Sequence, residues 1–484
     1  MQKQKIFNTL LPKIANRYGS IASASGTGKT VTLQSLAEGF SALVIPVFMV
    51  DVKGNLAGIS QAGSGNPKVD ASVAQLELSD FKPQTYPVTF WDVFGKMGHP
   101  VRTTIAEMGP LLLAHILNLT DAKGGVLNSI FKTSDDKGWL LLDLKDLRAM
   151  SQHAAENAAE YQTAYGNMSA TSVGTLQRAL LQIETEKGDQ LFGEPTLNLD
   201  DLMQIDSNGR GVINILASDQ LFNSPRVYAG LLLWLLSDLY EKLHEVGDLE
   251  KPKLVFFFYE THLLTTDAPP VLLQKIEQVI SLVRSKGVGV YFVSQNPLDI
   301  PDIALGQLGN LSQHALRAFT LRDQKAVKSA AETFKVNPKV DVAIEITKLG
   351  VGEALISFLD EKGIPTPVER AFIIPPQSRI CPITDAERAA VMQQSLLAGV
   401  YEKQVDKKSA YEILTACAAQ LAPQAEEGKG FDWGGMFGSM LGGGKSSSSD
   451  NILESAAKSA AHAIDSQLGL SIVRGVLGST LGRH

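Results

Sequence analysis

Short apolar runs recur along the chain and alternate with longer stretches that have helical periodicity. Six runs are apolar at nearly every position rather than at every second one: 20–22, 43–50, 88–91, 212–216, 254–258 and 288–293. Strands that are apolar on both faces are typical of a sheet covered on both sides. Helix-like stretches such as Val271–Ser285 lie between them. The pattern predicts an α/β fold with a mostly parallel, doubly wound sheet.

The pattern changes in the segment 102–208, where Leu-rich and Ala-rich helical stretches replace the strands. We interpret this segment as a helical insert between a first core part, 1–101, and a second core part, 209–425. Near the end of the second part, two strand-like runs at 353–359 and 368–374 flank a turn-rich stretch. They predict a small C-terminal β-hairpin region.

Two further segments follow the predicted core. Residues 426–450 are rich in Gly and Ser, which predicts a flexible linker. Residues 451–484 carry apolar positions at helical spacing and predict an amphipathic helix that docks on a partner, a second copy or a membrane. The membrane is the weakest of these because basic residues are few. The Leu-rich run 231–236 is too short to span a bilayer, and we interpret it as a buried helix.

The charge and cysteine content narrow the class of protein. The 484 residues include 44 basic and 51 acidic side chains, a formal net charge of −7. This argues against a polybasic nucleic-acid-binding protein. It does not exclude a local basic channel, because net charge averages over the whole surface. Cys381 and Cys417 are the two cysteines, which excludes a disulfide scaffold and a cysteine-built zinc site. The N-terminal segment lacks the apolar core of a secretory signal, so the cytoplasm is the expected compartment.

The strongest chemical signal is S-A-S-G-T-G-K-T at 23–30, between an apolar run and a helix-forming stretch. This is the context of a phosphate-binding P-loop, whose glycines let backbone N–H groups turn toward the phosphates. We expect Lys29 to reach the β- and γ-phosphates and Thr30 to offer its hydroxyl to Mg²⁺ as the metal ligand. Ser23 stands where the strict motif has Gly. The candidate nucleotide-binding residues are Ser25, Gly26, Thr27, Gly28, Lys29, Thr30 and Val31.

Two later apolar runs end in candidate catalytic groups. Glu260 follows the run 254–258 and stands in the position of the base that activates the attacking water. The preceding position holds the Mg²⁺-binding Asp in P-loop NTPases, and here it is Tyr259. Gln295 follows the run 288–293 and is placed to sense the γ-phosphate or polarise the water. Structural alternatives remain open: Glu260 caps a buried strand, and Gln295 caps a loop.

Several longer stretches match one family. They are 15–17, 51–54, 98–102, 251–258, 284–290 and 295–301, with a further match at 472–479. Over about residues 12–415 the chain resembles the HerA-like helicase/ATPase family of bacterial P-loop proteins. The resemblance implies a RecA-type core that uses ATP and Mg²⁺ with a glutamate base. It also implies a homo-oligomer, with hexameric rings among the relatives, and DNA as a partner, since relatives translocate or unwind DNA.

The chain departs from the family pattern at five positions. Ser23 stands where the family has Gly, and Asn55 and Tyr259 each stand where it has Asp. Thr261 stands where the family has Ala, and Leu311 stands where it has Arg. Loss of the Mg²⁺-binding Asp, and of an Arg that in ring relatives acts on a neighbour's nucleotide, predicts weakened turnover. Arg317 and Arg322 lie close by in sequence and are candidates to replace that Arg, or ordinary surface charges.

We therefore expect an ATP-binding, Mg²⁺-dependent ATPase of the HerA-like helicase/translocase type. The alternative is a scaffold or switch that holds ATP without hydrolysing it. A DNA motor rests on the family analogy alone, because no helix-turn-helix, zinc finger or basic cluster is seen. If Tyr259 is tolerated, Asp51 at a neighbouring strand end is a candidate to hold the outer-sphere waters of Mg²⁺. The eight scattered histidines lack the spacing of a metallohydrolase.

Overall fold

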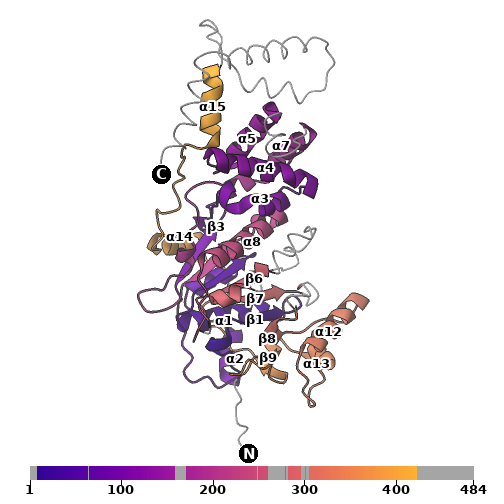
Figure 1. The fold of residues 1–484 in the computed structure, drawn as a ribbon. Helices are drawn as coiled ribbons and strands as arrows, with labels where there is room; N and C mark the ends of the chain where they lie inside the picture. Colours follow the sequence, from indigo (N-terminus) through magenta and orange to yellow (C-terminus); the bar gives the residue numbers. More distant parts are fainter. Residues whose placement is uncertain are drawn as a thin grey trace, which may run out of the picture. The chain divides into compact units, whose positions relative to one another are not determined.

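Ten strands of the described residues form one sheet in the order β10-β9-β8-β1-β7-β6-β2-β5-β3-β4. The computed structural model describes residues 8–63, 65–158, 170–247, 249–259, 278–279, 282–295, 300 and 305–421 (Figure 1). The strands are β1 (Tyr18–Ala22), β2 (Val47–Asp51), β3 (Val88–Asp92), β4 (His99–Pro100), β5 (Ile213–Ala217), β6 (Leu254–Tyr259), β7 (Val288–Ser294), β8 (Leu308–Gln313), β9 (Glu353–Ser357) and β10 (Glu369–Phe372).

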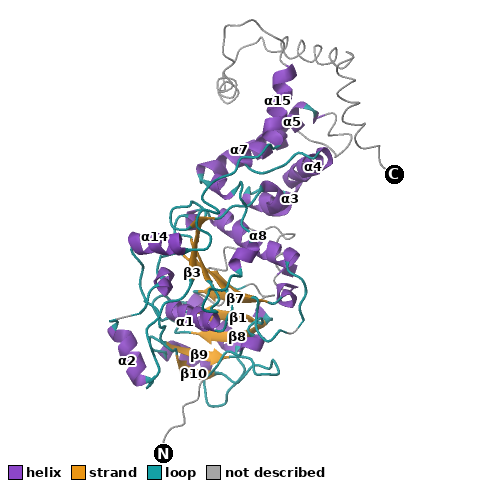
Figure 2. Ribbon diagram, turned by 90° about the vertical axis from the view of Figure 1, so that its left-hand side faces the viewer, coloured by secondary structure: helices purple, strands orange, loops and turns teal. Residues whose placement is uncertain are grey.

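Every strand pair is parallel except β8–β9 and β9–β10, which are antiparallel. Figure 2 shows the strands β7, β1, β8, β9 and β10 following one another toward one edge. The predicted hairpin strands are therefore present as β9 and β10, and β9 also pairs with β8 of the main sheet. The predicted mostly parallel α/β sheet is confirmed.

Both faces of the sheet are covered, as β6 shows most clearly. Phe256 and Phe258 belong to one buried apolar cluster, and the intervening Phe257 belongs to another. The first cluster also contains residues of helix α8 (Pro225–Lys242), and the second contains residues of helix α1 (Lys29–Ala42). This is the arrangement that a strand apolar on both faces requires.

The remaining helices follow the alternation of the sequence pattern. They are α2 (Pro67–Gln75), α3 (Ile105–Ile116), α4 (Asp121–Lys137), α5 (Leu144–Glu156), α7 (Ala170–Thr185), α12 (Leu321–Thr333), α13 (Val342–Lys348), α14 (Asp385–Gln394) and α15 (Ala410–Leu421). Leu231–Leu236 lie in α8 and are all buried, which confirms their interpretation as part of a buried helix. Among the described residues, no helix combines the length and the apolar character needed to cross a membrane.

Four helices, α3, α4, α5 and α7, lie between β4 and β5 in the sequence and pack on one another (Figure 1). Leu113, Leu127, Leu147 and Leu180 come from these four helices in turn and have no exposed surface. Helix α3 also packs on α8, which attaches the group to the sheet. The division of the chain at 101/102 and 208/209 stays a prediction.

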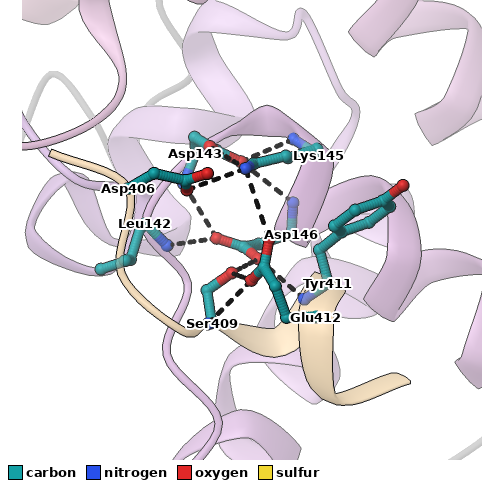
Figure 3. Close-up of polar contacts among 8 residues, drawn as sticks. All are labelled: Leu142, Asp143, Lys145, Asp146, Asp406, Ser409, Tyr411 and Glu412. Atoms are coloured by element: carbon teal, nitrogen blue, oxygen red, sulfur yellow. Dashed lines mark hydrogen bonds and ion pairs between the residues drawn. The ribbon is translucent and has the colours of Figure 1, made fainter. Parts of the chain in front are cut away.

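After β10 comes a segment without strands in the sheet, residues 375–409, which includes α14 and which we call the C-terminal strap. At its start, the backbone N–H groups of Gln377 and Ser378 donate to the carboxylate of Glu38 in α1. At its end, the hydroxyl of Ser409 and the N–H of Tyr411 donate to Asp146 in α5 (Figure 3). The strap thus contacts both the helix that follows β1 and the helices between β4 and β5.

Some predicted elements cannot be compared with the structure. The linker 426–450 and the helix 451–484 lie outside the described residues, as does most of the predicted helix Val271–Ser285. Two observed strands, β4 and β8, were not predicted, because β4 has two residues and β8 is largely polar.

Candidate functional site

The segment between β1 and α1 contains the predicted P-loop, and two of its glycines have positive φ angles. Gly26 and Gly28 have φ angles of +81° and +124°, which only glycine adopts without strain. The first turn of α1 begins directly afterwards at Lys29. Residues Ser25 and Gly26 are exposed. Backbone N–H groups at a helix N-terminus therefore lie beside an open loop, an arrangement that binds anions.

Neighbouring strand ends hold the loop in place on two sides. The N–H of Ser23 donates to the carbonyl of Ser294 in β7 at 3.2 Å, and the N–H of Ala24 donates to the carbonyl of Ala315 at 2.9 Å. Within the loop, the hydroxyl of Thr27 donates to the carbonyl of Ala24 at 2.9 Å. The loop is thus fixed between the ends of β7 and β8, the two neighbours of β1.

Ser23, the first departure from the strict motif, is fully buried. Its hydroxyl makes no hydrogen bond to any part of the chain that the structure describes. A buried hydroxyl without a partner costs free energy. The substitution is therefore compatible with the shape of the loop, but the added hydroxyl gains nothing within the described structure.

Lys29 is buried, and its ammonium group lies 4.9 Å from the centre of the Tyr259 ring. An ammonium over an aromatic face is held by a cation–π interaction. The backbone carbonyl of Tyr259 accepts a hydrogen bond from the hydroxyl of Tyr228 at 2.7 Å. The ring of Tyr259 thus lies beside the side chain of the loop lysine. Thr30, the candidate metal ligand, is half-buried in the first turn of α1, and Val31 follows it.

The structure describes Gln295 but not Glu260. Gln295 follows β7 and accepts a hydrogen bond from the hydroxyl of Ser25 at 3.2 Å, so the structure brings this pair of predicted site residues together. Glu260 lies outside the described residues, although Tyr259 before it ends β6. The catalytic roles of both residues stay predictions.

Asp51 does not face the P-loop. Its carboxylate accepts hydrogen bonds from the N–H groups of Lys53, Leu56 and Ala57, which fixes the turn after β2. Burial raises the pKa of this carboxyl despite those bonds. In the sheet, β6 and β7 separate β2 from β1, which places their ends about 14 Å apart. The suggestion that Asp51 holds the waters of Mg²⁺ beside Thr30 is therefore not supported.

Leu311 is buried in β8 and belongs to an apolar cluster with Phe334 and Leu355. The position that the family pattern gives to Arg is thus part of a small core in this chain. Arg317 is exposed, and the side chain of Arg322 is not described. No cluster of three or more His, Cys, Asp or Glu side chains suited to a metal ion occurs in the described ranges.

His314 lies beside the loop and is not among the residues that the sequence analysis singled out. It is fully buried directly after β8 and hydrogen bonds to Thr32 of α1. Burial, with a smaller contribution from the charge of Lys29, lowers its pKa to about 4, so the ring is neutral at pH 7. A lone histidine in a polar stretch gives no periodicity or spacing that would have marked it.

A model of the family described as helicase HerA-like C-terminal matches residues 1–484. No curated protein matches the chain significantly. Among solved structures, the unbound bacterial conjugative coupling protein TrwBdeltaN70 has a TM-score of 0.49 and 13% identity, covering 76% of this chain and 87% of its own. TrwB with ADP and Mg²⁺ has a TM-score of 0.46, 13% identity, and coverages of 79% and 92%. VirB4 of Thermoanaerobacter pseudethanolicus has a TM-score of 0.46, 13% identity, and coverages of 77% and 90%. These resemblances are too distant for any residue to be carried across.

Proposed function

Since the chain belongs to the helicase HerA-like C-terminal family, we propose that it binds ATP at the loop 23–30 and hydrolyses it slowly with Mg²⁺. The observation that carries the proposal is the loop itself. Gly26 and Gly28 have positive φ angles, Lys29 begins α1, and the loop is open to solvent at Ser25. Backbone N–H groups and the positive end of the helix then face the phosphates.

The residues of the site have distinct roles in this proposal. The backbone of residues 25–31 binds the phosphates, and Lys29 neutralises their charge. Thr30 supplies a hydroxyl ligand to Mg²⁺, the remaining ligands being phosphate oxygens and water. Bound Mg²⁺ would withdraw charge from the phosphate oxygens. Gln295 orients the attacking water, and Glu260 accepts its proton.

Tyr259 is the reason to propose slow turnover. A neutral phenol is a poorer partner for Mg²⁺ than the carboxylate that the family pattern has here. In the structure its ring lies against Lys29 instead. This same contact favours the second candidate function, a scaffold or switch that binds ATP without hydrolysing it. The two candidates share the binding site and differ only in the chemical step.

Binding is tested first, with a fluorescent non-hydrolysable ATP analogue and Mg²⁺. We expect Lys29→Ala to weaken binding by about 10-fold or more, because a charge-assisted contact to phosphate is lost. Lys68→Ala, which removes an exposed lysine at the start of α2, is the matched control and should leave the Kd unchanged. Equal affinities of the wild type and Lys29→Ala would show that the loop is not the nucleotide site.

Turnover of ATP is then measured for the wild type, Glu260→Gln and Tyr259→Asp. If Glu260 is the general base, Glu260→Gln lowers turnover by about 100-fold or more. If the missing carboxylate limits the reaction, Tyr259→Asp raises turnover by about 10-fold or more. Tight binding with no turnover in the wild type, and with none gained in Tyr259→Asp, would replace the ATPase by the non-hydrolysing scaffold.

The partners are proposed on family analogy. We propose a homo-oligomer, hexameric in the ring-forming manner, that acts on DNA in the cytoplasm. A DNA-binding protein should lose affinity steeply as salt rises, because counterions are released on binding. Fluorescence anisotropy with a labelled duplex between 50 and 200 mM salt tests this, and sedimentation velocity tests the oligomer. A DNA affinity that is absent at low salt would remove DNA from the proposal.

A further inference from the structure

The ring of His314 hydrogen bonds to two different elements at once. Its Nε2 lies 2.8 Å from the hydroxyl oxygen of Thr32, in the first turn of α1. Its Nδ1 lies 2.9 Å from the backbone carbonyl oxygen of Glu353, the first residue of β9. The side chain is fully buried. One imidazole therefore joins the start of the P-loop helix to the strand beyond β8.

These two partners fix the tautomer of the ring. The carbonyl of Glu353 can only accept, so Nδ1 carries the hydrogen and donates it. Nε2 then presents a lone pair, and the hydroxyl of Thr32 donates to it. Replacing the ring by an apolar side chain would leave a buried hydroxyl and a partly buried carbonyl without these partners, at a cost to both elements.

The same ring also packs against the glycine that ends the loop. A Cβ placed on Gly28 would come within 3.3 Å of His314 Cε1 and 3.4 Å of the backbone nitrogen of Gly352. The N–H of Gly352 donates to the carbonyl of Thr27 at 3.3 Å. His314 and the turn before β9 thus contact the loop at the residues whose N–H groups are expected to face the phosphates.

We propose that His314 is a positioning residue for nucleotide binding, which holds Gly28 and the first turn of α1 in the phosphate-binding conformation. The inference rests on the proposed function of the loop. His314 does not contact the phosphates in this scheme. It acts through Thr32 and Gly28, and so it sets how well the loop is organised before the nucleotide arrives. A preorganised loop loses less conformational freedom on binding.

Three substitutions separate the contributions of the ring. The amide of His314→Gln reaches the position of Nε2 and can accept from Thr32, whereas the amide of His314→Asn reaches the position of Nδ1 and can donate to Glu353. His314→Leu fills the space without either bond. His115→Gln removes another buried histidine, in α3, and is the matched control. Thr32→Val removes only the hydroxyl donor, and it tests the proposal if His314→Leu does not fold.

Two measurements are made on the full chain. The first is the Kd of the fluorescent non-hydrolysable ATP analogue with Mg²⁺. The second is hydrogen–deuterium exchange of the amides of residues 23–32 without nucleotide. We expect His314→Leu to weaken binding by about 10-fold or more and to speed exchange in this segment. His314→Gln should restore both to within about 3-fold of the wild type, and His115→Gln should change neither.

The exchange measurement separates this inference from the proposed function. If the wild type does not bind the analogue, the proposed function fails, and the positioning role is judged by loop exchange alone. Faster exchange in His314→Leu that is confined to residues 23–32 and reversed in His314→Gln would support the role. Unchanged exchange and unchanged affinity in both His314→Leu and Thr32→Val would overturn it.

Discussion

Two aromatic rings, those of Tyr259 and His314, interact with the ammonium group of Lys29. The ring of Tyr259 is 4.9 Å from it, and the charge of Lys29 helps to lower the pKa of His314. Neither adds a negative charge that would compete with phosphate for the lysine. These two side chains are thus compatible with an anion at Lys29, and neither supplies a carboxylate oxygen to a metal.

The neutral state of His314 makes folding sensitive to acid. Its pKa is lowered to about 4, chiefly by burial, whereas an unfolded histidine titrates near about 6.5. Between these values the unfolded chain binds a proton that the folded chain does not, so stability falls as pH drops. We expect the free energy of unfolding of the wild type to fall by about 2–3 kcal/mol more than that of His314→Gln between pH 7.5 and 4.5. Urea denaturation at the two pH values measures this, and parallel losses in the two proteins would contradict it.

Replacing a buried serine by alanine should have opposite effects on stability at Ser23 and at Ser41. The hydroxyl of Ser23 has no hydrogen-bond partner among the described residues, whereas that of Ser41 donates to the carbonyl of Gly211 at 2.6 Å. Both residues have no exposed surface. We expect Ser41→Ala to lower the free energy of unfolding by about 1–2 kcal/mol and Ser23→Ala to raise it by up to about 1 kcal/mol. Chemical denaturation decides, and equal losses in the two variants would show that Ser23 has a partner.

At the scale of elements, apolar strands could be predicted and polar ones could not. The runs at 254–258 and 288–293 became β6 and β7, because their side chains enter cores on both faces. In β8, the amide of Asn310 accepts from the N–H of Leu359, and that of Gln313 donates to the carbonyl of Ala22. Burial of these polar groups is offset by bonds to distant backbone, which no periodicity reveals.

The candidate site shows the same division. The loop at 23–30 stood out in the sequence as a P-loop candidate because its glycines, lysine and threonine are adjacent. The contact between Ser25 and Gln295, which lies beyond β7, agrees with the predicted neighbourhood. The joining of Thr32, His314 and Glu353 could not be predicted, because three separate segments meet only in the folded sheet.

The starts of α5 and α15 share one buried carboxylate. Asp146 caps α5 together with Asp143, and it also accepts from Ser409 and from the N–H of Tyr411 at the start of α15 (Figure 3). That the two helices share Asp146 cannot be seen in the sequence, because the two helix starts are more than 260 residues apart. The docking of α15 on α5 therefore depends on these hydrogen bonds to Asp146 as well as on apolar packing.

Loss of the shared bond should loosen α15 before the rest of the chain. We expect Ser409→Ala to destabilise the docked helix by about 1–2 kcal/mol, because the hydroxyl that lies between the carboxylates of Asp146 and Glu412 is lost. Hydrogen–deuterium exchange should then rise in α15 and at the start of α5 and stay unchanged in α1. Lys145→Ala is the control, since its contacts with Asp406 and Glu412 are partly exposed and contribute little. Equal effects of the two substitutions would show that the hydroxyl of Ser409 does not stabilise the docked α15.

On the scale of the whole molecule, the C-terminal strap contacts elements that are far apart in the sequence. After Glu38 of α1, it meets Asp201 through the hydroxyl of Tyr401, and His99 of β4 through Glu402. It then reaches Asp146 of α5. Each contact is local, but all are on one continuous segment. If the strap is ordered as a unit, freeing one end makes the bonds at the other end less effective.

This predicts a coupling between two substitutions at opposite ends of the strap. Glu38→Ala removes the acceptor of Gln377 and Ser378, and Ser409→Ala removes a donor to Asp146. Separate sites without shared partners normally have additive effects on stability. For this pair we expect the double variant to lose at least about 0.5 kcal/mol less than the sum of the single losses. Denaturation curves of the four proteins give the coupling.

Ser41→Ala with Ser409→Ala is the control pair, because Ser41 lies in α1 but bonds to Gly211 and not to the strap. Additive losses for Glu38→Ala with Ser409→Ala would mean that the two ends of the strap dock independently.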